Sequence, residues 1–158
     1  GRRLKDRLAL GFPLIGDLYR KQIVSRWSGT MSTLLESGIP VAQALAVVRG
    51  TVGNAIMEDD VARLEKEIVE GADLSDALKR SRVLPPSLGF IAGVGEESGE
   101  LARVLREVAD GYTEEVEIAS GRLTDLINPI LIVVLGVVIG FIVASILLPI
   151  TDFSGIQG

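Results

Sequence analysis

Apolar residues recur along the chain at spacings of three and four, the period of an amphipathic helix, and no segment shows the sustained alternation that a strand requires. The pattern therefore predicts an all-α protein. Five helices are expected in the first hundred residues, with apolar positions at Ile23, Trp27, Met31, Leu34 and Leu35; Val41, Leu45 and Val48; Met57, Val61, Leu64 and Ile68; Leu74, Ala77 and Leu78; and Leu88, Ile91 and Val94.

A few residues mark the boundaries of these helices. Gly38 ends the first helix and Pro40 begins the second, as is typical of glycine after a helix and proline at its first position. Asn54 and Asp73 are the expected N-caps of the third and fourth helices, because their side chains accept hydrogen bonds from free backbone N–H groups. The fourth helix breaks at "VLPPS", and Pro86 begins the fifth.

A sixth helix is expected from about Gly99 to Leu148, and its second half is apolar on all sides. The 26 consecutive residues from Leu126 to Thr151 carry no charge. A helix needs roughly 20 apolar residues to cross a bilayer. The sequence therefore predicts a transmembrane helix over residues 126–150, followed by a short tail over residues 151–158.

The fold class that follows is a six-helix antiparallel bundle over residues 19–125, whose last helix continues into the transmembrane helix. A weak internal repeat supports this organisation. "GIPVAQAL" from Gly38 and "GADLSDAL" from Gly71 share a pattern of glycine, an aliphatic residue and Ala-Leu, 33 residues apart. Two copies are too few for a solenoid. We expect two related helical hairpins packed as a bundle.

The stretch "FIAGVGEESGELARVL" resembles a phosphate-binding glycine loop at the start of a helix. A dinucleotide fingerprint needs a third glycine where Ser98 stands and a preceding strand, and Glu96 and Glu97 would repel a phosphate. The favoured interpretation is a turn between two helices, in which Gly95 ends one helix and Ser98 caps the next. Glu100 then lies in the first turn, where the helix dipole favours negative charge.

Composition narrows the chemistry that the chain can perform. It contains neither cysteine nor histidine, which removes thiolate chemistry and the commonest general base and metal ligand. Its net charge of −5 is opposite to that of a typical nucleic-acid binder. The acidic runs "MEDDVARLEKE" and Glu114, Glu115 and Glu117 lack the loop spacing of a calcium or magnesium site and fit solvated helix faces. We therefore expect no catalytic residue, metal or cofactor, and no nucleic-acid partner.

The membrane segment offers a packing surface and an orientation. Gly136, Gly140 and Ala144 recur every four residues, a pattern that lets helices approach closely in lipid, although glycine is common in membrane helices anyway. Arg106 and Arg122 precede the span and no Lys or Arg follows it, which predicts that the bundle lies in the cytoplasm and the tail outside. The basic residues within 1–18 suit a juxtamembrane segment after a further membrane helix preceding this sequence.

Several motifs in this order and spacing resemble the type II secretion inner-membrane platform family, also called general secretion pathway protein F, and its relatives in type IV pilus assembly. The motifs are "FPLIGDLYRK", "LLESGIPVAQAL", "VGNAI", "EGADLSDAL", "LPPSLGFIAGVGEESGEL" and "RLTDLINPILIVVLGVVIGFIVASILLPI". The resemblance covers nearly the whole chain, as the second copy of the family's cytoplasmic domain with its last membrane helix.

The resemblance implies a non-enzymatic, multi-pass protein of the bacterial inner membrane. Such a platform is expected to couple a cytoplasmic hexameric secretion ATPase to the assembly of pseudopilins, to contact other inner-membrane components, and to self-associate. On that premise, the residues expected to contact partners are Glu96, Glu97, Glu114 and Glu117. The alternatives are a platform for type IV pili, a single-pass membrane-anchored adaptor unrelated to secretion, or a fragment of a transporter.

Overall fold

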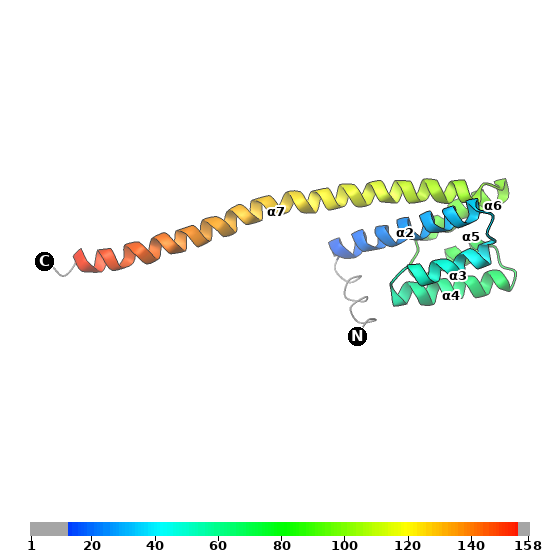
Figure 1. Cartoon of the computed structure of the whole chain (residues 1–158), viewed down its shortest axis with the longest axis horizontal. Coiled ribbons are helices and arrows are strands. Elements are labelled where there is room, and N and C mark those ends of the chain that lie inside the picture. Colours follow the sequence, from blue (N-terminus) through cyan, green and yellow to red (C-terminus); the bar gives the residue numbers. More distant parts are fainter. Residues whose placement is uncertain (1–12, 155–158) are drawn as a thin grey trace. The chain divides into compact units, whose positions relative to one another are not determined.

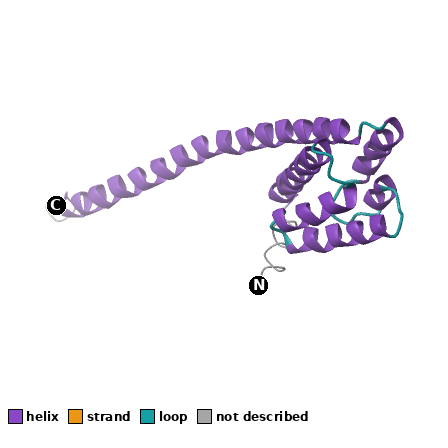
Figure 2. Ribbon diagram, turned by 45° about the vertical axis from the view of Figure 1, so that its right-hand side comes forward, coloured by secondary structure: helices purple, strands orange, loops and turns teal. Residues whose placement is uncertain are grey.

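The computed structural model describes residues 13–154, which form helices joined by short loops (Figures 1 and 2). No strand occurs within this part of the chain, which confirms the all-α class. The helices are α2 (Pro13–Glu36), α3 (Val41–Thr51), α4 (Ala55–Val69), α5 (Leu74–Lys79), α6 (Pro86–Ser98) and α7 (Leu101–Ser154). The basic residues from Arg2 to Arg7 and the end of the tail lie outside the described residues.

The chain divides into two units with the boundary between Ile118 and Ala119, inside α7. In the first unit, α3 packs on α2 and α4, and α5 packs on α4 and α6. The core is built from the apolar positions that recur along each helix. Its largest fully buried side chains are Trp27, Met31, Leu45, Met57, Leu64, Leu74, Leu78, Leu88 and Leu105. The helical period of the sequence thus identified most of the core.

Helix α2 also contacts the first turns of α7. The Ser32 hydroxyl donates to the carbonyl of Ala102 at 2.7 Å, and the Ser25 hydroxyl donates to the carbonyl of Ala109 at 3.2 Å. A salt bridge of 3.0 Å joins Glu36 to Arg106. In these two hydrogen bonds the later residue of α2 contacts the earlier residue of α7.

Helix α6 differs from its expected arrangement. Leu88 is buried as expected, but Ile91 and Val94 are exposed, and the buried side of α6 otherwise consists of small residues, Gly89, Ala92 and Gly95. A Cβ atom on Gly89 would lie 2.7 Å from the carbonyl oxygen of Ser75 in α5. Because the two backbones approach so closely, glycine and alanine occupy the contact and the larger side chains face outward.

The second unit, described by itself, is the C-terminal part of α7. Every residue from Gly121 to Ile150 is exposed, and this helix is long and apolar enough to cross a membrane by length and composition, with a mean hydropathy of 3.2 in its most apolar window. Pro129 lies inside the helix. The membrane-spanning character expected for residues 126–150 agrees with this composition.

Candidate functional site: an acidic face and a polar network

The glycine-rich corner between α6 and α7 is a turn, but its residues act differently from the expectation. Helix α6 continues to Ser98, so Gly95 does not end it; instead a Cβ on Gly95 would lie 2.9 Å from the Cα of Leu101. Gly99 ends the helix with a left-handed backbone, at φ 72°. The expected cap by Ser98 is wrong, because Ser98 is the last residue of α6 and its hydroxyl donates back to the carbonyl of Val94 at 2.8 Å.

The corner is a helix C-cap rather than an anion site. The N–H of Glu100 donates to the carbonyl of Gly95 at 2.9 Å, and the N–H of Gly99 donates to the carbonyl of Glu96 at 3.4 Å. These bonds satisfy carbonyls at the end of α6, as expected where a left-handed glycine terminates a helix. Both donors are thereby engaged within the protein.

The four glutamates expected to contact partners do not share one environment. Glu96 is half-buried, and its carboxylate accepts hydrogen bonds from the N–H groups of Leu74 at 2.7 Å and Ser75 at 3.2 Å. It therefore caps α5, a role that the sequence assigned to Asp73, whose side chain makes no capping bond. Glu97 is exposed on the last turn of α6.

Glu114 and Glu117 are exposed on α7, together with Glu107 and Asp110. Spacings of three and four residues place all four carboxylates on one side of the helix, and we call them the acidic face. Glu107 pairs with Arg103 at 2.6 Å. The other three carboxylates make no salt bridge with a residue of the described part, so they retain charge that can attract a basic surface.

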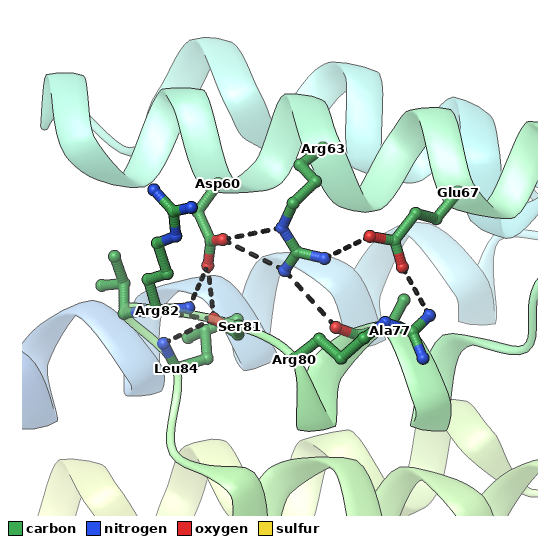
Figure 3. Close-up of polar contacts among 9 residues, drawn as sticks. Asp60, Arg63, Glu67, Ala77, Arg80, Ser81, Arg82 and Leu84 are labelled. Carbon is green, nitrogen blue, oxygen red and sulfur yellow. Dashed lines mark hydrogen bonds and ion pairs between the residues drawn. The ribbon is translucent and has the colours of Figure 1, made fainter.

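A polar network between α4, α5 and the loop before α6 was not anticipated from the sequence (Figure 3). Asp60 in α4 is buried, with 5% of its surface exposed, and its carboxylate accepts from Arg63 Nε at 3.2 Å and Nη2 at 3.1 Å. It also accepts from the Ser81 hydroxyl and, at 3.3 Å, from the N–H of Arg82. The Ser81 oxygen in turn accepts from the N–H of Leu84 at 2.8 Å.

The same network continues toward α5. Glu67 accepts hydrogen bonds from Arg63 and, at 2.6 Å, from Arg80, and Arg63 also donates to the carbonyl of Ala77 at 3.4 Å. The hydrogen bond from Arg80 lowers the pKa of Glu67; burial opposes it and Arg63 adds to it. The network joins α4, α5 and the loop before α6. One signal was present in the sequence, since Asp60 lies among Met57, Val61 and Leu64 on the apolar side of α4.

The described residues contain no group of three or more His, Cys, Asp or Glu side chains placed to hold a metal ion. The carboxylates of "MEDDVARLEKE" are spread around α4, and Asp60 and Glu67 bind arginines instead. What the first unit offers chemically is charged surface and hydrogen bonding, which suit contact with another macromolecule.

Gly136, Gly140 and Ala144 lie four residues apart on the exposed C-terminal part of α7. A Cβ atom on Gly136 or Gly140 would meet no other atom of the structure within 4 Å. Their expected part in packing membrane helices therefore stays a prediction, and it concerns helices outside this chain or in other copies of it.

Comparison with known proteins adds an independent observation. The family described as type II secretion system (T2SS), protein F, matches residues 27–149. A type IV pilus assembly protein PilC of Thermus thermophilus is 40% identical over 156 residues, covering 98% of this chain and 38% of the relative. A PilC of Myxococcus xanthus is 36% identical, covering 98% and 37%, and a type II secretion system protein F of Pseudomonas aeruginosa is 31% identical, covering 94% and 37%. The chain thus spans under two fifths of the length of these relatives.

Proposed function

Because this chain belongs to the type II secretion system protein F family, we propose that it forms part of a platform subunit of a protein secretion machine in the bacterial inner membrane. The observation that carries this proposal is the family match over residues 27–149, which includes both the helical bundle and the apolar helix. In this role the bundle lies in the cytoplasm as an antiparallel six-helix domain, and residues 126–150 cross the membrane. The reversed pairing of α2 with α7 supports the antiparallel arrangement.

The proposed activity is mechanical and non-enzymatic. The platform binds a cytoplasmic hexameric ATPase on one side and other inner-membrane components and pseudopilins on the other, so that ATP hydrolysis drives pseudopilin assembly. Proteins of this kind need shaped, charged surfaces more than reactive groups. The paired arginines and glutamates around α4 and α5 support such a role, because they stiffen the domain that receives the force.

A second candidate is the equivalent platform of a type IV pilus. It is favoured by identity, since the relatives from Thermus and Myxococcus named for pilus assembly are 40% and 36% identical, against 31% for the secretion protein of Pseudomonas. Deleting the gene distinguishes the two: loss of protein secretion supports the first candidate and loss of surface pili the second. If both phenotypes are absent, the platform role is wrong.

We place the ATPase contact on the acidic face, chiefly at Glu114 and Glu117, and on the neighbouring corner, where Glu97 is exposed. Glu96 contributes less, because its carboxylate already binds the α5 backbone. Charge reversal of Glu114 and Glu117 to lysine is expected to abolish co-purification of the ATPase and to reduce secretion or piliation. Glu70→Lys reverses one charge on the exposed end of α4. It is the control for the single variants Glu114→Lys and Glu117→Lys, and it should leave both co-purification and secretion or piliation intact.

Self-association is assigned to the small residues of the membrane helix. Leucine at both Gly136 and Gly140 would separate helices that approach through this side, because backbone contact requires small residues. Cross-linking in native membranes is expected to lose the dimer band in that double variant and to retain it in Val137→Leu, an adjacent substitution on another side. Retention of the band in the glycine variant would exclude this surface.

A further inference from the structure

A groove of about 420 Å³ lies in the first unit, where the start of α2, the loop before α6 and one turn of α7 meet. Helix α2 lines it with Asp17, Arg20, Lys21 and Val24, which share one side of the helix. The loop contributes Arg82 and an apolar floor that includes Leu84 and Pro85, and α7 contributes Tyr112 and Glu115. Its volume falls within the range of ligand-binding pockets.

Some of the charged side chains that line this groove form salt bridges with one another, and two arginines do not. The ammonium group of Lys21 forms salt bridges with both carboxylates of the groove, Asp17 at 3.2 Å and Glu115 at 3.1 Å. These contacts raise the pKa of Lys21, that with Glu115 most. The guanidinium groups of Arg20 and Arg82 make no hydrogen bond or salt bridge with any residue of the described part of the chain. Most other arginines in the described part of the first unit pair with a carboxylate, namely Arg49, Arg63, Arg80, Arg103 and Arg106.

The wall that carries Arg82 is also fixed in place. The N–H of Arg82 donates to the buried carboxylate of Asp60, and the Ser81 hydroxyl donates to the same carboxylate. Pro85 has an extended backbone, with φ −67° and ψ 143°. A loop held in this way loses little conformational freedom on binding a ligand, which favours affinity.

We propose that this groove binds an extended acidic segment of another protein, with carboxylates on Arg20 and Arg82 and an apolar side chain against Leu84 and Pro85. The guanidinium fork matches a carboxylate in geometry and charge, and the proline-containing floor offers an apolar surface without competing donors. This assigns a second contact surface, opposite in charge to the acidic face of α7. It goes beyond the platform role and does not depend on which machine the platform serves.

The test uses the complete chain in neutral detergent and a fluorescein-labelled synthetic peptide of alternating glutamate and leucine. Fluorescence anisotropy is expected to show binding that weakens about a hundredfold in Arg20→Gln/Arg82→Gln, since each of the two charged hydrogen-bonding groups lost contributes about one factor of ten. The matched control is Arg26→Gln. Arg26 is an exposed arginine of α2 outside this groove, so its loss should leave the affinity unchanged.

A reciprocal variant separates loss of binding from loss of folding. Arg20→Glu/Arg82→Glu is expected to reject the glutamate peptide and to bind a lysine–leucine peptide of the same length. The proposal is overturned if the glutamine variant binds the acidic peptide as tightly as the original chain, or if Arg26→Gln weakens it equally. Displacement by phosphatidylglycerol in mixed micelles with the same detergent, but not by unlabelled acidic peptide, would assign a lipid to the groove and overturn the proposal as well.

Discussion

Asp60 is a carboxylate inside the bundle that four donors satisfy, from Arg63, Ser81 and the backbone of Arg82. Replacing it with alanine removes the acceptor of all four bonds, and only Arg63 keeps other partners within the described residues, namely Glu67 and the carbonyl of Ala77. Such a change costs far more than the loss of an exposed ion pair. We expect Asp60→Ala to lower the free energy of unfolding by about 3 kcal/mol. Trp27, the single tryptophan and 1% exposed, reports the unfolding of the bundle by fluorescence in urea.

Glu70 provides the comparison for Asp60. It lies at the C-terminal end of α4, the helix that carries Asp60, and is exposed to solvent. Its carboxylate is 3.9 Å from the ammonium of Lys66. An exposed pair at that distance contributes little, so Glu70→Ala should change the unfolding free energy by less than about 0.5 kcal/mol. Equal losses in the two variants would contradict a special role for the Asp60 network.

Glu67 makes the stability of the bundle depend on acid. Its pKa lies below the ordinary value near 4.5, chiefly because Arg80 donates to the charged form, with burial opposing and Arg63 adding to the effect. A carboxylate with a lowered folded-state pKa contributes stability that is fully present above its unfolded pKa and is lost as the pH falls through the folded pKa. We therefore expect the free energy of unfolding to fall on acidification below about pH 4.5, and to fall less steeply in Glu67→Gln.

At the scale of the element, the contact between α5 and α6 depends on a glycine. A Cβ on Gly89 would lie 2.7 Å from the Ser75 carbonyl oxygen and 2.9 Å from the Lys79 nitrogen, both backbone atoms that cannot rotate away. Gly89→Ala must therefore push the helices apart, and we expect it to cost about 1–3 kcal/mol in unfolding free energy. Thermal unfolding followed by circular dichroism would measure it.

The opposite sign is expected for Gly50→Ala in α3. A Cβ there would meet no other atom within 4 Å, and alanine favours the helix over glycine by up to about 1 kcal/mol. If both alanine variants shift the unfolding temperature in the same direction, the close approach at Gly89 does not control the packing of α6.

The elements also show what a sequence can predict. The apolar period located the helices, and Asn54 caps α4 as expected, accepting from the N–H groups of Ile56 at 2.9 Å and Met57 at 3.1 Å, because these are local relations. The cap of α5 by Glu96 joins residues 22 positions apart. The groove that contains Arg20 and Arg82 is formed by three separate segments, from α2, the loop before α6 and α7. Such partners depend on how the helices pack. The spacing of apolar residues also did not predict that α6 buries mainly its small residues.

For the whole molecule, the proposed role requires the helical bundle to lie on the cytoplasmic side of the membrane. The bundle must face the cytoplasm to reach an ATPase, and the positive charges of Arg106 and Arg122, just before the apolar segment, favour this orientation. The chain contains no cysteine, so a cysteine introduced into it labels a chosen position. Glu70→Cys marks the bundle and Gly158→Cys marks the tail.

A membrane-impermeant maleimide applied to intact spheroplasts would then report the side of the inner membrane on which each cysteine lies. We expect Gly158→Cys to react in the intact spheroplasts and Glu70→Cys to react only after their lysis. The reverse pattern would place the bundle in the periplasm, where no ATP-driven partner could bind it, and would remove the proposed coupling. Protection of both positions until lysis would mean that the apolar part of α7 does not cross the bilayer, because a crossing helix must carry its two ends to opposite sides.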